Sequence, residues 1–150
     1  MKKVIIIILI LLLTACGISN SKRTTIYEYY ITVDNIDIKP NMFYDTVKYT
    51  IGEPNHTRYD EENNTIYEYP GLEIKTYYSN NVEKIFSITI TNSEIHTNEG
   101  ITIGNTLEDI KNTYGEGYYA EENKYVYNLN NTCLSFVLDN DIIIEIEYHM

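Results

Sequence analysis

The chain has 150 residues, 43% hydrophobic and 22% charged, which suits one domain of ordinary core size and is too short for two. Asp and Glu outnumber Lys and Arg by 22 to 11, so the formal net charge is −11. Because a nucleic-acid binder needs a basic face, this charge argues against DNA and RNA as partners. Sixteen tyrosines with only seven glycines and three prolines indicate a strand-rich folded chain rather than a disordered one.

The N-terminus has the charge pattern of an export signal. A Lys-Lys pair precedes an unbroken apolar run, Val4 to Leu13, which is too short to span a membrane. The run closes with Leu13-Thr14-Ala15-Cys16, which resembles the bacterial lipobox. The resemblance implies a lipoprotein signal peptide over residues 1–15 and lipid attachment, palmitate included, at Cys16. A second interpretation is a plain signal peptide with a coincidental Cys.

A lipidated Cys16 would place the rest of the chain outside the cytoplasm. Residues 16–25 are then the lipidated Cys and a short polar tether, and residues 26–150 form a single domain. Anionic headgroups repel so acidic a surface, so we assign the membrane contact to the acyl chains. The expected location is the cell membrane of a one-membrane bacterium or the outer membrane of a two-membrane one.

The next predicted elements are a strand and a helix. Alternating residues over Ile26–Val33 predict an opening strand. Tyr44, Val47 and Ile51 lie at i, i+3 and i+7 and predict a short helix that ends at Gly52. We expect Asn41 to cap its N-terminus.

A second helix is predicted further along the chain by the same spacing. Leu107, Ile110 and Tyr114 again lie at i, i+3 and i+7, and the helix should end at Gly115. Thr106 and Asp109 are spaced as a capping box, although Asp replaces the preferred Glu or Gln. The two helical stripes are offset by 63 residues, which indicates an internal duplication.

Strands follow each predicted helix. Ser79-Asn80-Asn81-Val82 and Asp139-Asn140-Asp141-Ile142 predict two hairpin turns, each opening a final strand. Alternation predicts that one face of each final strand is buried. The residues of these two faces are Val82, Lys84, Phe86, Ile88 and Ile90, and Ile142, Ile144, Ile146, Tyr148 and Met150.

The expected fold class is therefore α+β. We expect a two-layer domain in which two short helices cover one face of an antiparallel sheet. It would be built from a duplicated helix plus three-strand unit, at about residues 36–91 and 100–150.

The run Ile101 to Ile110, followed by Tyr114-Gly115, resembles the helix-start motif of the SmpA/OmlA (BamE-type) small lipoproteins. The duplication is similar to the β-lactamase inhibitor protein fold. The first copy departs from the motif, with Asn41 at the Gly position and Phe43 at the Thr position. The first resemblance implies a role in envelope assembly, and the second implies capture of an enzyme. Neither supplies contact residues that match this chain.

No catalytic motif is present, so we expect no enzyme activity, although distant residues can still converge in space. His56, His96 and His149 lie outside any recognisable motif, and no metal or cofactor is expected. Acidic loops leave calcium open as an alternative, without the EF-hand spacing. With Cys16 lipidated, only Cys133 remains, and a small buried hydrophobe is favoured over a reactive thiol.

Tyrosines beside acidic residues are common in protein-recognition surfaces. The candidate partner-binding residues are Tyr59, Asp60, Glu61, Glu62, Tyr67, Tyr119, Glu121 and Glu122. We expect a cell-envelope lipoprotein that acts as a non-catalytic protein-binding module in envelope assembly or maintenance. The alternative is an inhibitor or immunity protein that captures a secreted enzyme or toxin, because an acidic face suits a basic target.

Overall fold

A computed structural model describes residues 28–150, in which ten strands and two helices form. In chain order the elements are β1 (Ile31–Val33), β2 (Ile36–Ile38), α1 (Tyr44–Ile51), β3 (His56–Tyr59), β4 (Thr65–Tyr69), β5 (Leu72–Ser79), β6 (Val82–Ile90), α2 (Leu107–Tyr114), β7 (Tyr119–Glu121), β8 (Lys124–Leu129), β9 (Thr132–Asp139) and β10 (Ile142–His149).

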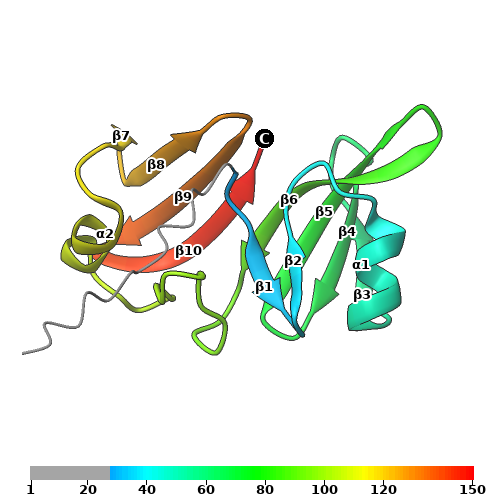
Figure 1. The fold of residues 1–150 in the computed structure, drawn as a ribbon, viewed down its shortest axis with the longest axis horizontal. Coiled ribbons are helices and arrows are strands. Elements are labelled where there is room, and N and C mark those ends of the chain that lie inside the picture. Colours follow the sequence, from blue (N-terminus) through cyan, green and yellow to red (C-terminus); the bar gives the residue numbers. More distant parts are fainter. Residues whose placement is uncertain (1–27) are drawn as a thin grey trace, which may run out of the picture.

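Eight of the strands form one antiparallel sheet in the order β3-β4-β5-β6-β10-β9-β8-β7 (Figure 1). Within β3–β6 and within β7–β10, each strand pairs with its neighbour in the chain. The two sets meet where β6 pairs with β10, through four residue pairs that run from Ile90↔Ile146 to Ser87↔His149. Strands β3 and β7 therefore lie at opposite edges of the sheet.

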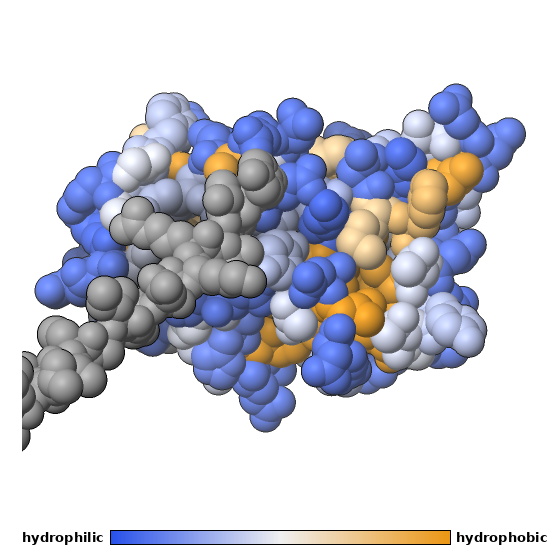
Figure 2. Space-filling view, in the orientation of Figure 1, coloured by the Kyte–Doolittle hydropathy of each residue, from blue (hydrophilic) through white to orange (hydrophobic). Residues whose placement is uncertain are grey.

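One face of this sheet is covered by α1, α2 and the β1–β2 hairpin, which crosses between the helices (Figure 1). Ile31 and Ile38 of the hairpin, Val47 of α1 and Ile110 of α2 are all 0% exposed and belong to a single hydrophobic core. Figure 2 shows this side of the molecule, with hydrophobic surface gathered between α1, β2 and the β5–β6 hairpin. The core thus lies between the sheet and this covering layer.

The segment before each helix pairs with a central strand and so fixes where the helix begins. Asn41 N–H donates to Ile85 O at 2.7 Å, and Gly104 N–H donates to Ile143 O at 2.9 Å. The predicted end signals are confirmed, because α1 and α2 stop at Gly52 and Gly115, which adopt φ of 90° and 84°.

The capping box of the second helix is confirmed, but the predicted cap of the first is wrong. Thr106 Oγ1 accepts from Asp109 N–H at 3.2 Å, and an Asp109 carboxylate oxygen accepts from Thr106 N–H at 2.8 Å. The N-cap of α1 is instead Phe43, which supplies no capping side chain. Asn41 lies two residues earlier with φ 68°, and its Oδ1 accepts from Lys84 Nζ at 3.0 Å.

The predicted α+β class, built from a duplicated helix plus three-strand unit, is wrong. The described residues are mostly β: an eight-stranded sheet and a two-stranded one, with two helices of only eight residues each. Two short strands escaped prediction, β3 and β7, because all their residues are exposed and no buried alternation marks them. Within the described residues the opening strand is also shorter than predicted, since residues 28–30 form no strand and β1 begins at Ile31 and pairs only with β2.

Both predicted hairpin turns are present, but the buried faces of β6 and β10 differ from the prediction. In β6, Ile85, Ile88 and Ile90 are buried, whereas Val82 and Phe86 are exposed. The register shifts at Phe86, because Lys75 pairs with Ser87 while the next residue, Thr76, pairs with Ile85. Such a β-bulge adds one residue to a strand and reverses the inside–outside alternation beyond it.

The same irregularity occurs in β10, between Ile143 and Glu145. Ile143, Ile146 and Tyr148 are buried there, while Ile142, Ile144 and Met150 are exposed. The predicted alternation is therefore wrong for Ile142 and Ile144, which it places on the buried face.

Candidate functional site

The face of the sheet opposite the helices and the β1–β2 hairpin is covered by no other element of residues 28–150. We call it the bare face. On β8, Tyr127 points into the core, where its ring lies 5.4 Å from that of Tyr114 on α2. Lys124 and Val126 alternate with Tyr125 and Tyr127 along this strand and therefore lie on the bare face.

Four strands of the bare face arrange their side chains in two neighbouring rows. The register aligns one row across β7, β8, β9 and β10: Tyr119, Val126, Ser135 and Glu147. The second row lies two residues along each strand: Glu121, Lys124, Val137 and Glu145. Neighbouring strands are about 4.8 Å apart, so side chains adjacent in a row are within contact range. We call these eight residues the β7–β10 platform.

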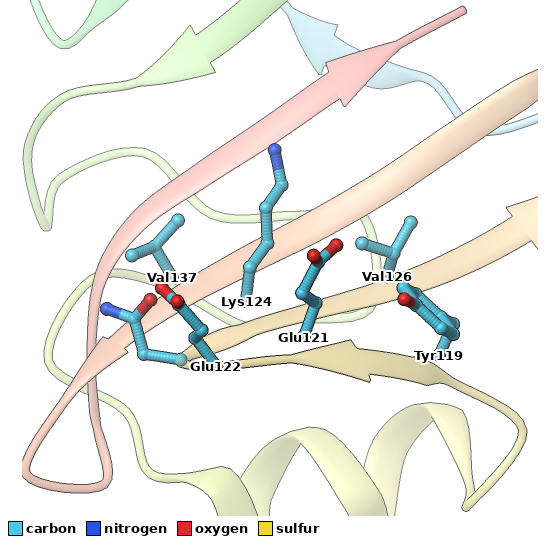
Figure 3. Close-up of a pocket in the computed structure, with 7 residues that line it drawn as sticks. Tyr119, Glu121, Glu122, Lys124, Val126 and Val137 are labelled. Carbon is cyan, nitrogen blue, oxygen red and sulfur yellow. The ribbon is translucent and has the colours of Figure 1, made fainter.

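A shallow pocket of about 370 Å³ lies on the platform, next to the β7–β8 turn (Figure 3). It is lined by Tyr119, Glu121, Glu122, Asn123, Lys124, Val126 and Val137. Figure 3 shows Glu121, Lys124 and the two valines projecting from the side of the sheet away from α2. The valines provide apolar surface, and carboxylates and the Tyr119 ring surround it.

The turn beside this pocket is fixed to its neighbouring strand. Glu122 occupies the left-handed region at φ 53°, which allows β7 and β8 to join tightly. Asn123 Nδ2 donates to Leu138 O at 2.9 Å, and Leu138 N–H donates to Asn123 O at 2.9 Å. The pocket wall is therefore held by β9 as well as by its own hairpin.

The platform carries more negative charge than its one cation neutralises. Lys124 Nζ lies 3.5 Å from Glu147 Oε2. Within residues 28–150, Glu121, Glu122 and Glu145 form no ion pair, and all three are exposed. Desolvation and the charge of Glu147 raise the pKa of Glu145. Such an arrangement suits cationic groups supplied by another molecule.

The β3–β6 part of the bare face differs, because its charges are matched within the chain. Arg58 Nε donates to Glu68 Oε1 and Arg58 Nη2 donates to Glu73 Oε2, both at 2.7 Å. Lys75 Nζ lies 2.6 Å from Asp60 Oδ2. Aromatic side chains cluster beside them: the Phe86 ring lies 6.3 Å from that of Tyr77 and 5.3 Å from Lys75 Nζ.

The predicted partner-binding residues do not form one surface. Tyr59, Asp60, Glu61 and Glu62 belong to the β3–β4 hairpin at one edge of the sheet, and Tyr119, Glu121 and Glu122 to the β7–β8 hairpin at the other. Seven strand spacings separate these edges, roughly 30 Å. Tyr67 lies on the covered face, stacked on Tyr44 with ring centroids 3.9 Å apart. The structure thus gathers only the last three residues of the set in one pocket.

Seven residues of the platform and its pocket escaped prediction: Lys124, Val126, Val137, Glu145, Asn123, Ser135 and Glu147. The pairing of β8 with β7 places Lys124 and Val126 in the platform. The sequence signals this pairing only through β7, a strand of three residues. Glu145 lies just past the β10 bulge, so strict alternation does not show its face. Continuing the alternation of Tyr119 and Glu121 across the tight turn would have found the first two.

Cys133, Ser135 and His149 lie together on the bare face. His149 Nε2 is 2.9 Å from Ser135 Oγ, and Cys133 is the cross-strand neighbour of His149. Ser135 is only 1% exposed, so its hydroxyl is shielded from solvent. Cys133 is half-buried rather than buried, its thiol donates to Asn128 Oδ1, and burial raises the pKa of the thiol. The hydrogen bond between Ser135 and His149 is therefore shielded from solvent on the serine side.

The acidic loops contribute no metal site among residues 28–150, where no three His, Cys, Asp or Glu side chains are placed to hold an ion. Asp60 is engaged by Lys75 and by Asn64, whose backbone N–H donates to Asp60 Oδ1 at 2.8 Å. The predicted signal peptide, the predicted lipid-attachment residue Cys16 and the predicted tether lie outside the described residues. Within residues 28–150, no helix is long and apolar enough to cross a membrane.

Comparison with known proteins defines the fold but no family. No family model and no curated protein match the chain. Among solved structures, an extracellular protein containing an SCP domain from Bacillus anthracis str. Ames is similar at a TM-score of 0.59 and 10% identity. The match covers 88% of this chain and 50% of that one, so the chain spans about half the length of this structural relative.

A DUF4309 family protein (YjgB) from Bacillus subtilis subsp. subtilis str. 168 is similar at a TM-score of 0.45 and 16% identity, over 70% of this chain and 76% of that one. Neither structure is described as a BamE-type lipoprotein or a β-lactamase inhibitor protein.

Proposed function

We propose that the protein is a lipoprotein of the bacterial cell envelope, attached through Cys16, that acts outside the cytoplasm as a non-catalytic protein-binding module in envelope assembly or maintenance. The observation that supports binding is the bare face. Antiparallel sheets commonly leave one face exposed to solvent. Here the solvent-exposed face carries exposed aromatic residues, Tyr119 at 60% and Phe86 at 38%. Aromatic side chains are enriched at protein interfaces.

A second candidate function, an inhibitor or immunity protein for a basic enzyme or toxin, is supported by the charges. Residues 28–150 contain seven basic side chains, and six of them are in ion pairs with the chain's own carboxylates: Lys39, Lys48, Arg58, Lys75, Lys111 and Lys124. The seventh, Lys84, lies 5.7 Å from the centre of the Phe43 ring. Every Lys and Arg of residues 28–150 is thus engaged, while many carboxylates of the same residues face solvent, which favours a basic target.

Site-specific photo-crosslinking tests the binding function in the bacterium that makes the protein. A photoreactive phenylalanine analogue would replace one exposed aromatic residue at a time in the full-length chain. Tyr119 and Phe86 represent the bare face, and Tyr49, 93% exposed on α1, is the matched control. We expect crosslinks to another envelope or secreted protein from the two bare-face positions. Crosslinks from Tyr49 alone, or from no position, would contradict the proposal.

The lipid anchor has a separate test. Cys16→Ala should leave an unprocessed precursor that incorporates no labelled palmitate, because the thiol that receives the lipid is gone. Cys133→Ala is the control and should be labelled and processed like the natural chain. Labelling that persists in Cys16→Ala would end the lipoprotein proposal.

A further inference from the structure

The two halves of the bare face differ in one respect that points to the kind of partner. In β3–β6 each acidic side chain that belongs to the cross-strand rows, Glu68 and Glu73, contacts Arg58. In β7–β10 the corresponding rows hold Glu121 and Glu145 without an ion pair among the described residues. The uncompensated charge of the bare face is therefore concentrated on one half.

We propose that the β7–β10 platform binds a basic segment of another protein, one that presents lysine or arginine side chains. This inference rests on the proposed protein-binding function and adds the location of the contact and the chemistry of the partner. Opposite charge brings such a segment to the platform and orients it there. An anionic lipid surface or a nucleic acid would be repelled by the same carboxylates.

The shape of the platform fits the long stems of basic side chains. Val126 and Val137 lie diagonally across β8 and β9 and form its apolar centre, with Tyr119 at the outer edge. Lys and Arg pack their aliphatic stems on apolar surface while the charged group remains at the rim. Here the rim carries Glu121 on one side and Glu145 on the other, so stem and head group are both accommodated.

The ion pair of Lys124 leaves room on the platform for a cation from a partner protein. Lys124 lies between Glu121 and Val137 in its row, yet its Nζ contacts Glu147 of the neighbouring row. It therefore leaves both ends of its own row negative. Glu121 on β7 and Glu145 on β10 flank the two valines of β8 and β9. This arrangement suits a segment lying across the strands with basic residues on either side.

Fluorescence anisotropy with the full-length chain in a non-ionic detergent tests the inference directly. The probe is a short fluorescein-labelled peptide in which lysine alternates with threonine, and the same peptide with glutamate in place of lysine is its control. We compare the natural chain with the triple variant Glu121→Gln, Glu122→Gln and Glu145→Gln. A second triple variant, Asp45→Asn, Glu94→Gln and Glu108→Gln, removes as much charge from exposed carboxylates elsewhere.

We expect the platform variant to bind the lysine peptide about tenfold more weakly and the control variant less than about twofold more weakly, since each exposed ion pair contributes little alone. The difference should shrink at higher ionic strength. Equal weakening by both variants would show attraction to total charge and would overturn the inference, and so would no weakening in the platform variant. Thermal unfolding of each variant confirms that the isosteric changes leave the fold intact.

This outcome is distinguishable from failure of the proposed function. If Tyr119 and Phe86 still crosslink to a protein while the platform variant binds the lysine peptide as tightly as the natural chain, the bare face binds a partner by other means. The platform assignment is then wrong and the protein-binding function stands.

Discussion

Lys124 Nζ lies 3.5 Å from Glu147 Oε2, although the residue directly across from Lys124 on β7 is Glu121. Because Lys124 pairs with Glu147, Glu121 at the β7 edge of the platform has no ion-pair partner among the described residues. We expect Lys124→Gln to bind the lysine peptide about threefold more tightly, because the one competing cation of the platform is gone. Lys111→Gln is the matched control, since Lys111 pairs with Glu116 on the other face at the same 3.5 Å. Equal tightening by both variants would contradict a local effect.

The buried face of α2 gives a prediction about stability. Ile110 is 0% exposed and faces the core, whereas Asn112, two residues along the same helix, is exposed. Ile110→Asp should lower the free energy of unfolding by about 4 kcal/mol or more, because it buries a charge with no partner. Asn112→Asp adds the same charge at the surface and should change it by less than about 1 kcal/mol. Urea denaturation measures both, and similar losses would mean that the helix packs differently.

Asp60 predicts a pH dependence of stability. Its hydrogen bond with Lys75, and then those with Asn64, hold the pKa of Asp60 well below its ordinary value. A lowered carboxyl pKa stabilises the fold above the unfolded-state value of about 3.9, and this contribution is lost as pH falls toward the folded-state value. Asp60→Asn should therefore be less stable than the natural chain at pH 7, by a margin that narrows below pH 4.

Denaturation of Asp60→Asn at pH 7 and at pH 3 measures that margin. Glu61→Gln in the same loop is the control, because Glu61 is exposed and forms no ion pair among residues 28–150. Its stability should follow that of the natural chain at both pH values. A deficit in Asp60→Asn of equal size at the two pH values would point to a lost shape contact instead of a lost charge.

The β5–β6 turn predicts that two substitutions at one position differ in their effect on stability. Asn80 and Asn81 adopt φ of 52° and 62°, as a two-residue hairpin turn requires. Asn81→Val should cost about 1 to 2 kcal/mol, because a β-branched residue is strained in the left-handed region. Asn81→Gly should be neutral or nearly so. Thermal unfolding of the pair checks this, and equal stability of the two variants would refute the turn conformation.

Local signals explain which elements were predictable. The helices end at Gly52 and Gly115 and the hairpins turn at Asn80-Asn81 and Asn140-Asp141 because each depends on a few adjacent residues. The bulge at Phe86 depends on the register between β5 and β6, which no single strand encodes. The same limit hid Glu145, since its face is set by the bulge in β10.

The candidate site was predictable only at its outer edge. Tyr119, Glu121 and Glu122 stand out in the sequence as a tyrosine beside acids, and they do line one pocket. Tyr59 to Glu62, at the opposite edge of the sheet, also combine a tyrosine with acids but belong to a hairpin whose Asp60 is bound by Lys75. Composition alone does not reveal that ion pair, because Lys75 lies on β5, two strands away from the end of β3.

The four residue pairs between β6 and β10 have a consequence for how the chain folds. Ile90 and Ile146, which meet there, are 56 residues apart in the sequence, whereas the other sheet contacts join consecutive strands through short turns. Closing so long a loop is slow compared with forming a hairpin. The two halves should therefore acquire hairpin structure early and assemble late. In stopped-flow experiments, a side-chain truncation on β6 such as Ile88→Val should slow the final refolding phase. A side-chain truncation at the β3–β4 edge of the sheet should mainly accelerate unfolding.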